Sequence, residues 1–576
     1  MLLQRVVTTS AAVSGSAGRL AKVDQIAALL REVPAGEIPI AVAFLSGELT
    51  QRQIGVGYAA IVDLLGPPGG PAAAGAAESL PAPHLTAAGG AAESQPAAHL
   101  PGPVLPPPPA AAVLTLTQAD AAFGAIGALA GPGSQADRRK LLGELLGQAT
   151  EEERQFLVRL LAGDLRQGAL TGVMTEAIAA AAGVPATAVR RAYQVGGSLA
   201  RAALAALSGP RGDPAQAQRA LLAVTPQVGR PLQPMLAATA PTLAAALERI
   251  SPAAVEWKID GIRIQVHRDG SEVRVFTRTL DDITGRVPEL VAAALSLRVT
   301  TAVLDGEAVA LYPDGRPRPF QVTSARTASQ ADVARLSEQT PLTAFLFDLL
   351  HLDGADLLEV PASERMSRLA AVAPAELVIP RIVTGDLAEA TTFFESAITQ
   401  GHEGVVVKSL DAAYGAGRRG SDWIKVKPRH TLDLVVLAAE WGHGRRQGWL
   451  SNLHLGARDE ATGGMVMLGK TFKGLTDALL TWQTARLLEL ADPPMPPGAA
   501  ARPHGVVRVR PELVVEIAFD GVQASTRYPG GVTLRFARVV RYRDDKTAAE
   551  ADTIEAVRAL WGGGEPLVRD GVAGGQ

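Results

Sequence analysis

The chain has 576 residues, of which 47% are apolar and 20% charged, and this length predicts about three or four domains of roughly 150 residues each. Its formal charge of −3 gives no overall signal of nucleic-acid binding, so a DNA or RNA surface would have to come from local clusters of arginine. The chain contains no cysteine, which excludes disulfides, thiolate nucleophiles and zinc sites with cysteine ligands.

The N-terminal part, residues 1–228, is expected to be a helical domain. It begins without an apolar run long enough for a secretion signal, and no later segment could span a bilayer, so we expect a soluble, cytoplasmic protein. Residues 66–113 are rich in Pro, Ala and Gly and contain the repeat AAESLPAPHL/AAESQPAAHL, which is typical of a disordered insertion. Apolar residues recur at helical spacing in residues 14–33, 117–131, 137–165 and 171–184.

The sequence pattern changes from helical to strand-like at about residue 250. Short apolar or alternating runs separated by Asp-Gly turns predict strands and hairpins, with helices over 288–297 and 389–399 between them. After Pro428 a further series of strands predicts a small β-barrel. We therefore expect an α/β domain over 229–429, an all-β domain over 430–562 and a mobile tail over 563–576.

The stretch AVEWKIDG places Lys258 in a predicted strand. Alternation puts Glu256, Lys258 and Asp260 on one face of that strand, opposite an apolar face, and Gly261 follows where the backbone can turn. Taken alone, this pattern also fits a surface strand with ordinary alternation of charge.

Lysine is rare in this chain, which has 46 arginines but only 9 lysines. Lys258 and four others, Lys408, Lys425, Lys427 and Lys546, nevertheless lie in short segments that also carry acids or arginines. An amine can lose its proton and attack phosphorus, whereas a guanidinium cannot. Because crowded positive charge and partial burial lower the pKa of an amine, we expect a lysine nucleophile and a covalent lysine intermediate.

In order along the chain, the motifs are KxDGxR from Lys258, FTR, LDGE, FLFDLL, EGVVVK, WIKVK and LRFARVVRYRDDK. This series resembles the ATP-dependent DNA ligases. The resemblance implies a multidomain α+β protein with an all-α DNA-binding domain, an α/β adenylation domain of the nucleotidyltransferase, ATP-grasp-like type, and an all-β OB-fold domain. It also implies ATP and Mg²⁺ as cofactors and nicked duplex DNA as partner, clamped by a monomer in the cytoplasm, at the nucleoid in a bacterium.

The resemblance also implies roles for single residues. Lys258 would attack the α-phosphate of ATP and hold AMP, and Glu307 and Glu403 would hold Mg²⁺. Glu256 would contact the adenine amino group and Phe347 would stack on the base, although Phe347 also fits a core position. The other expected nucleotide contacts are Arg263, Arg278, Arg419, Lys425 and Lys427.

Two further groups of residues would contact pyrophosphate or DNA. In the last motif these are Arg535, Arg538, Arg541 and Lys546, and Ala537 stands where the family usually has proline. In the helical domain Gly55 and Gly57 would let backbone amides approach phosphates, and Arg166 would add a cationic contact.

The resulting hypothesis is a DNA ligase that seals 3′-hydroxyl/5′-phosphate nicks through a lysyl-AMP intermediate in replication, repair or recombination. The alternatives are an RNA ligase or an mRNA-capping guanylyltransferase, which the large helical domain disfavours, and an NAD-dependent DNA ligase, which the absence of cysteine disfavours. A non-catalytic DNA-binding protein is the alternative of a different class.

Overall fold

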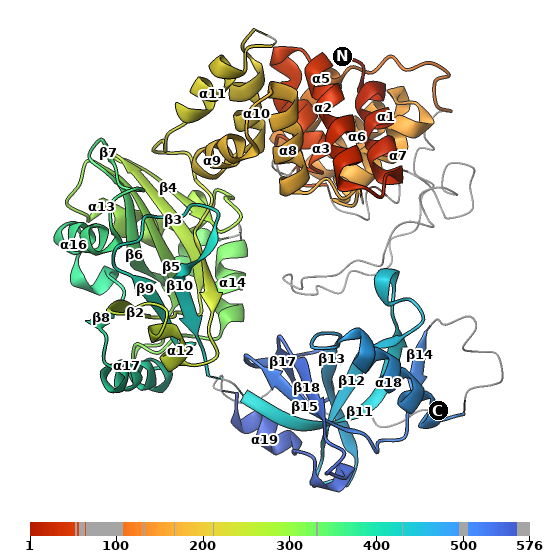
Figure 1. Ribbon diagram of the computed structural model, residues 1–576, viewed down its shortest axis with the longest axis vertical. Helices are drawn as coiled ribbons and strands as arrows, with labels where there is room; N and C mark the ends of the chain where they lie inside the picture. Colours follow the sequence, from red (N-terminus) through yellow and green to blue (C-terminus); the bar gives the residue numbers. More distant parts are fainter. Residues whose placement is uncertain are drawn as a thin grey trace.

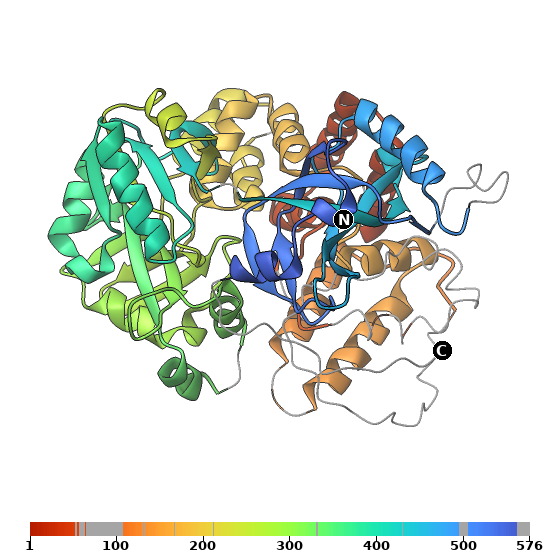
Figure 2. The same ribbon diagram turned by 90° about the horizontal axis from the view of Figure 1, so that it is seen from below.

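The chain forms three bodies that follow one another in sequence and lie along an open arc (Figure 1), with the middle body at one side in both views (Figures 1 and 2). The computed structural model describes residues 1–51, 54–56, 61, 64, 107–129, 131, 133–165, 167–210, 212–329, 332–428, 430–494 and 505–561. In these ranges no helix is both long enough and apolar enough to cross a membrane.

The first body is built from helices packed around one core, in which the rings of Phe44, Phe123 and Phe156 meet. The expected single stretch over 137–165 is two helices, because Thr150 and Glu153 form a capping box that starts a new helix. The helices are α1 (Leu3–Gly15), α2 (Arg19–Glu32), α3 (Ile38–Leu45), α5 (Leu116–Ala128), α6 (Ser134–Gln148), α7 (Glu151–Leu161), α8 (Thr171–Ala182), α9 (Ala186–Gly196), α10 (Leu199–Leu207) and α11 (Pro214–Leu222).

The middle body contains two five-stranded sheets. The first has the order β1-β10-β9-β2-β8 and is antiparallel except for the β1/β10 pair. Its strands are β1 (Leu236–Thr239), β2 (Ala253–Trp257), β8 (Arg381–Thr384), β9 (Val405–Ser409) and β10 (Arg419–Val426). The second sheet has the order β4-β3-β5-β6-β7 and is antiparallel throughout. Its strands are β3 (Ile262–Asp269), β4 (Glu272–Thr277), β5 (Thr301–Ala310), β6 (Leu342–Leu352) and β7 (Ala355–Asp356).

Helices cover the outer faces of these sheets (Figure 1). The predicted helices over 288–297 and 389–399 are confirmed as α13 (Pro288–Leu295) and α17 (Leu387–Thr399). The others are α12 (Leu243–Leu247), α14 (Phe320–Ala328), α15 (Val333–Gln339) and α16 (Ala362–Val372).

The third body is rich in strands, and its main sheet has the order β13-β12-β11-β15-β18, with β14 also paired to β11. Residues 532–542 form two strands and not one, because Phe536 has a φ of +55°, which ends the first strand and lets the next begin. The strands are β11 (His430–Trp441), β12 (Leu450–Arg458), β13 (Met465–Thr471), β14 (Val506–Arg508), β15 (Val514–Phe519), β16 (Gly521–Ala524), β17 (Val532–Arg535) and β18 (Arg538–Tyr542). Two helices that the expected all-β pattern omitted, α18 (Asp477–Glu489) and α19 (Ile554–Ala559), pack on this sheet.

The chain crosses from the first sheet to the second at Lys258. The strand predicted through Asp260 ends earlier, since β2 stops at Trp257. The turn into β3 requires Gly261, because a Cβ there would lie 2.3 Å from the carbonyl oxygen of Ala308. Lys258 therefore lies in a short connection between two sheets and not within a strand.

Candidate functional site

A cavity of about 770 Å³ lies between the two sheets of the middle body. The third body contributes to its wall through Asp520, Arg535 and Phe536. Most of the residues predicted to contact the nucleotide lie in this wall: Glu256, Lys258, Arg263, Arg278, Glu307, Phe347, Arg419, Lys425 and Lys427.

Backbone and side-chain contacts together fix Lys258 beside Glu403. The Lys258 amide donates to the carbonyl of Gly404 at 2.8 Å, and the Glu403 amide donates to the carbonyl of Lys258 at 3.0 Å. Gly404 has a φ of +133°, and a Cβ there would lie 2.3 Å from the carbonyl oxygen of Val426, so only glycine fits. The Lys258 ammonium then lies 2.6 Å from a carboxylate oxygen of Glu403. The alternative of an ordinary surface strand is excluded, because β2 lies between β9 and β8 and Glu256 is buried.

Electrostatics at Lys258 differ from the prediction. Burial lowers the pKa of Lys258, but attraction by Glu403 and Glu307 outweighs burial and leaves that pKa above its ordinary value. The expectation of a lowered pKa is therefore wrong, because the charges nearest to the Lys258 amine are carboxylates and not cations. Burial raises the pKa of Glu403, yet Lys258 and Lys427 bring it down to about 2. Glu403 accordingly forms a bridge between two ammonium groups, with Lys427 at 2.8 Å.

Glu307 differs from Glu403 in having no hydrogen bond or salt bridge to any residue that the structure describes. Burial raises the pKa of Glu307 to about 7, against the opposing effect of Lys258 and Arg263. No cluster of three or more metal-ligating side chains occurs in the described ranges. An unpaired carboxylate electrostatically coupled to a second one fits Mg²⁺, which takes oxygen ligands and commonly keeps its remaining positions for water and phosphate.

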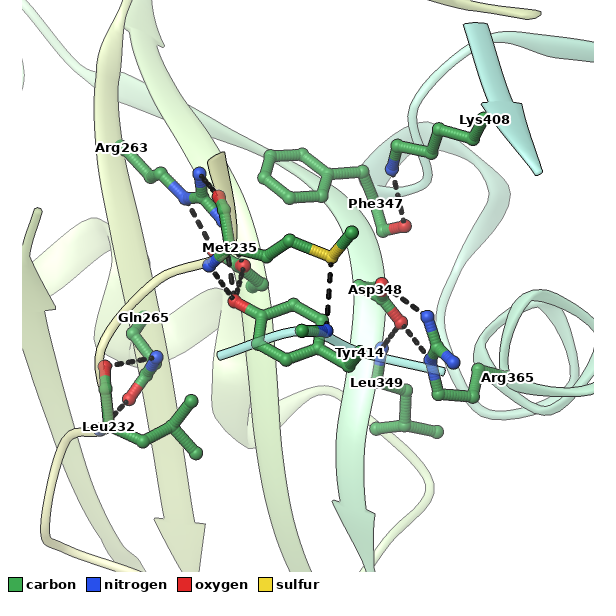
Figure 3. A network of polar contacts seen from close by, with 12 residues as sticks. Leu232, Met235, Arg263, Gln265, Phe347, Asp348, Leu349, Arg365, Lys408 and Tyr414 are labelled. Atoms are coloured by element: carbon green, nitrogen blue, oxygen red, sulfur yellow. Dashed lines mark hydrogen bonds and ion pairs between the residues drawn. The ribbon is translucent and has the colours of Figure 1, made fainter. Parts of the chain in front are cut away.

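Glu256 is buried at the base of the cavity and is held by two cations. One of its oxygens lies 2.5 Å from Arg381 and the other 2.6 Å from Lys408. The Lys408 ammonium also lies 4.5 Å from the centre of the Phe347 ring and 4.2 Å from that of Trp423. Figure 3 shows Lys408 over Phe347, whose carbonyl it contacts at 3.4 Å. Phe347 is only partly buried and lines the cavity, so its ring is not an ordinary core aromatic.

The guanidinium of Arg263 is held by contacts with other residues of the middle body. It forms a two-pronged salt bridge with Asp305, with contacts of 3.0 and 2.5 Å, and also donates to the carbonyl of Met235. The Tyr414 hydroxyl donates to Asp305 at 2.6 Å and accepts from the Met235 amide at 2.9 Å, which closes the network (Figure 3). Arg263 lines the cavity, but these contacts make it a support for the cavity wall.

The remaining predicted nucleotide contacts present positive charge. Burial, together with the nearby Lys427 and Lys258, lowers the pKa of Lys425. Arg278 and Arg419 are exposed, and no hydrogen bond or salt bridge joins either side chain to a described residue. This side of the cavity is therefore suited to an anion.

Arg535 is the one residue, of the four in the last motif expected to contact pyrophosphate or DNA, that reaches the cavity. Its guanidinium contacts Asp260 at 2.6 and 3.3 Å, and Lys427 contacts Asp520 at 3.4 Å, so two ion pairs join the third body to the middle one. Arg541 instead pairs with Glu516 at 2.7 Å, Lys546 pairs with Asp433 at 2.6 Å, and Arg538 is exposed on β18. The structure does not bring these three residues to the cavity.

Gly55, one of the two glycines expected to approach phosphate in the helical body, has a φ of +68°, a left-handed conformation that favours glycine, and it lies beside the guanidinium of Arg138. Gly57 and Arg166 lie outside the described residues.

Known proteins match every part of this arrangement. The model of the ATP dependent DNA ligase domain matches residues 234–427, that of the ATP dependent DNA ligase C terminal region matches 446–546, and that of the DNA ligase N terminus matches 3–179. A protein named "Probable DNA ligase" from Mycobacterium sp. (strain KMS) is 54% identical over 97% of this chain and 99% of its own length. The chain belongs to the ATP-dependent DNA ligase family. The family assignment made from the motifs is confirmed, and with it the use of ATP and Mg²⁺.

Further relatives of this ligase extend over the same length. A "Probable DNA ligase" from Mycobacterium marinum is 53% identical over 97% of this chain and 100% of that protein. A solved structure titled "Pmar-Lig_PreS3" is 16% identical and covers 93% of this chain and 99% of that one, with a TM-score of 0.54. That last likeness concerns the fold alone.

Sequence reasoning missed several residues that shape the ligase cavity. Arg381 and Tyr414 contact Glu256 and Asp305 from a distant strand and loop, and no local pattern marks them. Asp305 lies in the LDGE motif, but that motif does not indicate its salt bridge with Arg263. Lys408 is one of the few lysines and ends the EGVVVK motif, but its position close to two aromatic rings follows only from the packing of β6 against β9 and β10.

Proposed function

We propose that this ligase seals 3′-hydroxyl/5′-phosphate nicks in duplex DNA and that Lys258 is the residue that carries AMP. The observation that carries the proposal is the position of Lys258, whose main chain is fixed by backbone hydrogen bonds and whose amine contacts Glu403 at the wall of a cavity rich in cations. In the first step the Lys258 Nζ–phosphorus bond forms as the bond from the α-phosphate to pyrophosphate breaks, and the amine loses its proton. AMP then passes to the 5′-phosphate of the nick, and the 3′-hydroxyl displaces it.

The surrounding residues have different roles in this first step. Glu256 accepts from the adenine amino group, and Phe347 stacks on the base, with Arg381 and Lys408 holding that carboxylate in place. Arg278, Arg419, Lys425 and Lys427 supply positive charge where negative charge develops on the phosphate. Mg²⁺ held by Glu307 and Glu403 would add positive charge beside the phosphates.

We also propose domain roles with the boundaries expected from the sequence. Residues 1–228 bind DNA, 229–429 form the adenylation domain with a nucleotidyltransferase, ATP-grasp-like fold, and 430–562 form an OB-fold domain. Two ion pairs between the middle and third bodies support closure of the OB domain over the nucleotide, with Arg535 facing the departing pyrophosphate. A single chain with three such bodies can surround a duplex as a monomer, and we place this activity in the cytoplasm at the nucleoid, in replication, repair or recombination.

The test begins with the lysine. Incubation of the protein with ATP and Mg²⁺, followed by intact mass spectrometry, should give an AMP adduct that is absent from Lys258→Ala. An adduct that persists in Lys258→Ala would assign the nucleophile elsewhere, and loading of GMP from GTP would favour a capping enzyme. A nicked duplex offered with DNA or RNA strands on either side then identifies the polynucleotide that is sealed.

A further inference from the structure

A second cavity lies where the helical body meets the adenylation domain. Its volume is about 690 Å³, and it is formed by α9 on one side and residues 412–422 on the other. Figure 1 shows α9 as the part of the helical body next to the strands of the middle body. Apart from Arg419, none of the residues given a role in the proposed reaction lines this cavity.

Backbone hydrogen bonds between the two bodies hold the walls of this cavity in place. The Gln233 amide donates to the carbonyl of Gln194 in α9 at 3.0 Å, and the Gly417 amide donates to the carbonyl of Gln233 at 2.9 Å. Gly417 has a φ of +64°, and a Cβ there would lie 3.0 Å from the side chains of Gln194 and Gln233, so the loop passes close to α9. The hydroxyl of Tyr414, in the same loop, is buried in the Asp305 network. The two walls are therefore held at a fixed separation.

The charged groups in this cavity are mostly cationic. Four arginines line it against two carboxylates, those of Glu359 and Asp422. Arg191 is engaged, since it donates to the carbonyls of Leu222 and Val224. The three remaining arginines, Arg190, Arg418 and Arg419, make no side-chain hydrogen bond or salt bridge with any residue in the described ranges. Three unpaired guanidinium groups around one hollow suit a phosphate, which guanidinium groups bind with two parallel hydrogen bonds.

This cavity adjoins the nucleotide site. Arg419, the first residue of β10, lines both cavities, and β10 continues to Lys425 beside Lys258. A phosphate-bearing chain that occupies the second cavity would thus be directed toward the lysine.

We propose that the second cavity binds a backbone phosphate of the DNA substrate and that Arg190 and Arg418 are its anion contacts. The proposal rests on the family's action on DNA and adds a site at which the helical body and the adenylation domain hold the same stretch of duplex. Contacts of this kind set position and affinity without reading sequence. The same chemistry could serve the triphosphate of ATP, so the test separates the two sources.

The test uses the full chain with both arginines replaced, Arg190→Gln/Arg418→Gln. The control is Arg249→Gln/Arg274→Gln, which removes the same charge from exposed arginines that line neither cavity. Dissociation constants are measured for a nicked duplex with a 3′-dideoxy end, at several salt concentrations, with enzyme already loaded with AMP. We expect roughly tenfold weaker binding near 0.1 M salt and a salt dependence reduced by about one phosphate contact relative to the control. The rate of lysyl-AMP formation from ATP without DNA should equal that of the control.

Each other result has a defined meaning. Equal affinity and equal salt dependence in the two variants would overturn the proposal, and so would a loss confined to lysyl-AMP formation, which would assign the cavity to the triphosphate. Arg190→Lys/Arg418→Lys should recover only part of the affinity, because it restores the charge but not the two parallel hydrogen bonds of each guanidinium group. A wild-type enzyme that fails to seal nicks would count against the proposed function. If the wild-type enzyme seals nicks but its DNA affinity does not change when Arg190 and Arg418 are replaced, the result counts against this site alone.

Discussion

Lys408→Met should destabilise the adenylation domain far more than an exposed lysine replacement would. Lys408 and Glu256 are each 2% exposed, and their charged atoms lie 2.6 Å apart. Removing one partner of a buried pair costs about 3–5 kcal/mol, because the other charge is left uncompensated. Since Arg381 still contacts the other oxygen of Glu256 at 2.5 Å, we expect the lower end, about 3 kcal/mol. Lys140→Met, at an exposed position in α6, is the matched control.

The assay is urea unfolding followed by tryptophan fluorescence, because Trp423, one of the six tryptophans of the chain, lies against the Lys408 ammonium. A double replacement, Lys408→Met with Glu256→Gln, removes both charges and should recover part of the lost stability. The reasoning fails if Lys408→Met behaves like Lys140→Met, or if the double variant is as unstable as the two single losses added together.

Three further outcomes follow from the site. Lys258→Arg should abolish lysyl-AMP formation, whereas Lys425→Arg should leave a measurable rate because it keeps the charge. Lysyl-AMP formation is followed by intact mass spectrometry. Equal rates in the two variants would contradict the proposal that Lys258 forms the bond and Lys425 supplies only charge. The pKa of Glu307 is raised from 4.5 to about 7 in the folded protein, so the folded protein binds this proton more tightly than the unfolded chain does. The free energy of unfolding should therefore fall by roughly 3 kcal/mol in all as the pH rises from 4.5 to 7. The buried His267 and His402 have lowered pKa values and change stability with pH in the opposite direction. The measurement is therefore the difference in Tm between wild type and Glu307→Gln, without metal or nucleotide, from pH 4.5 to 7.5. Parallel Tm profiles of the two proteins would refute the effect of Glu307. Arg535→Gln should slow lysyl-AMP formation while leaving Tm nearly unchanged, since a partly exposed ion pair contributes about 1 kcal/mol or less; a sealing defect on pre-adenylated nicks with normal loading from ATP would show that Arg535 acts in a later step.

Helices and strands with strong local patterns could be predicted from the sequence. The periodicity of α2, α8, α13 and α17 and the Asp-Gly hairpin between β3 and β4 depend on neighbouring residues alone, and these elements form as expected. The end of β2 at Trp257 was not predictable in this way. There Lys258 bonds to Gly404 and Glu403, nearly 150 residues away, and the positive φ of Gly404 departs from regular strand pairing.

The motifs alone were enough to determine the family and the candidate nucleophile, because both depend on the types of reacting residues and on their order along the sequence. Only the tertiary structure decided which charges each group meets. It places Glu403 and Glu307 around Lys258, so that the pKa of this amine is raised where crowding by lysines suggested the opposite. It also brings Arg535 to the cavity while Arg541 and Lys546 pair with acids of their own domain. The physical reason is that an ion pair depends on distance in space, which for these residues is set by the packing of separate sheets and not by their spacing in sequence.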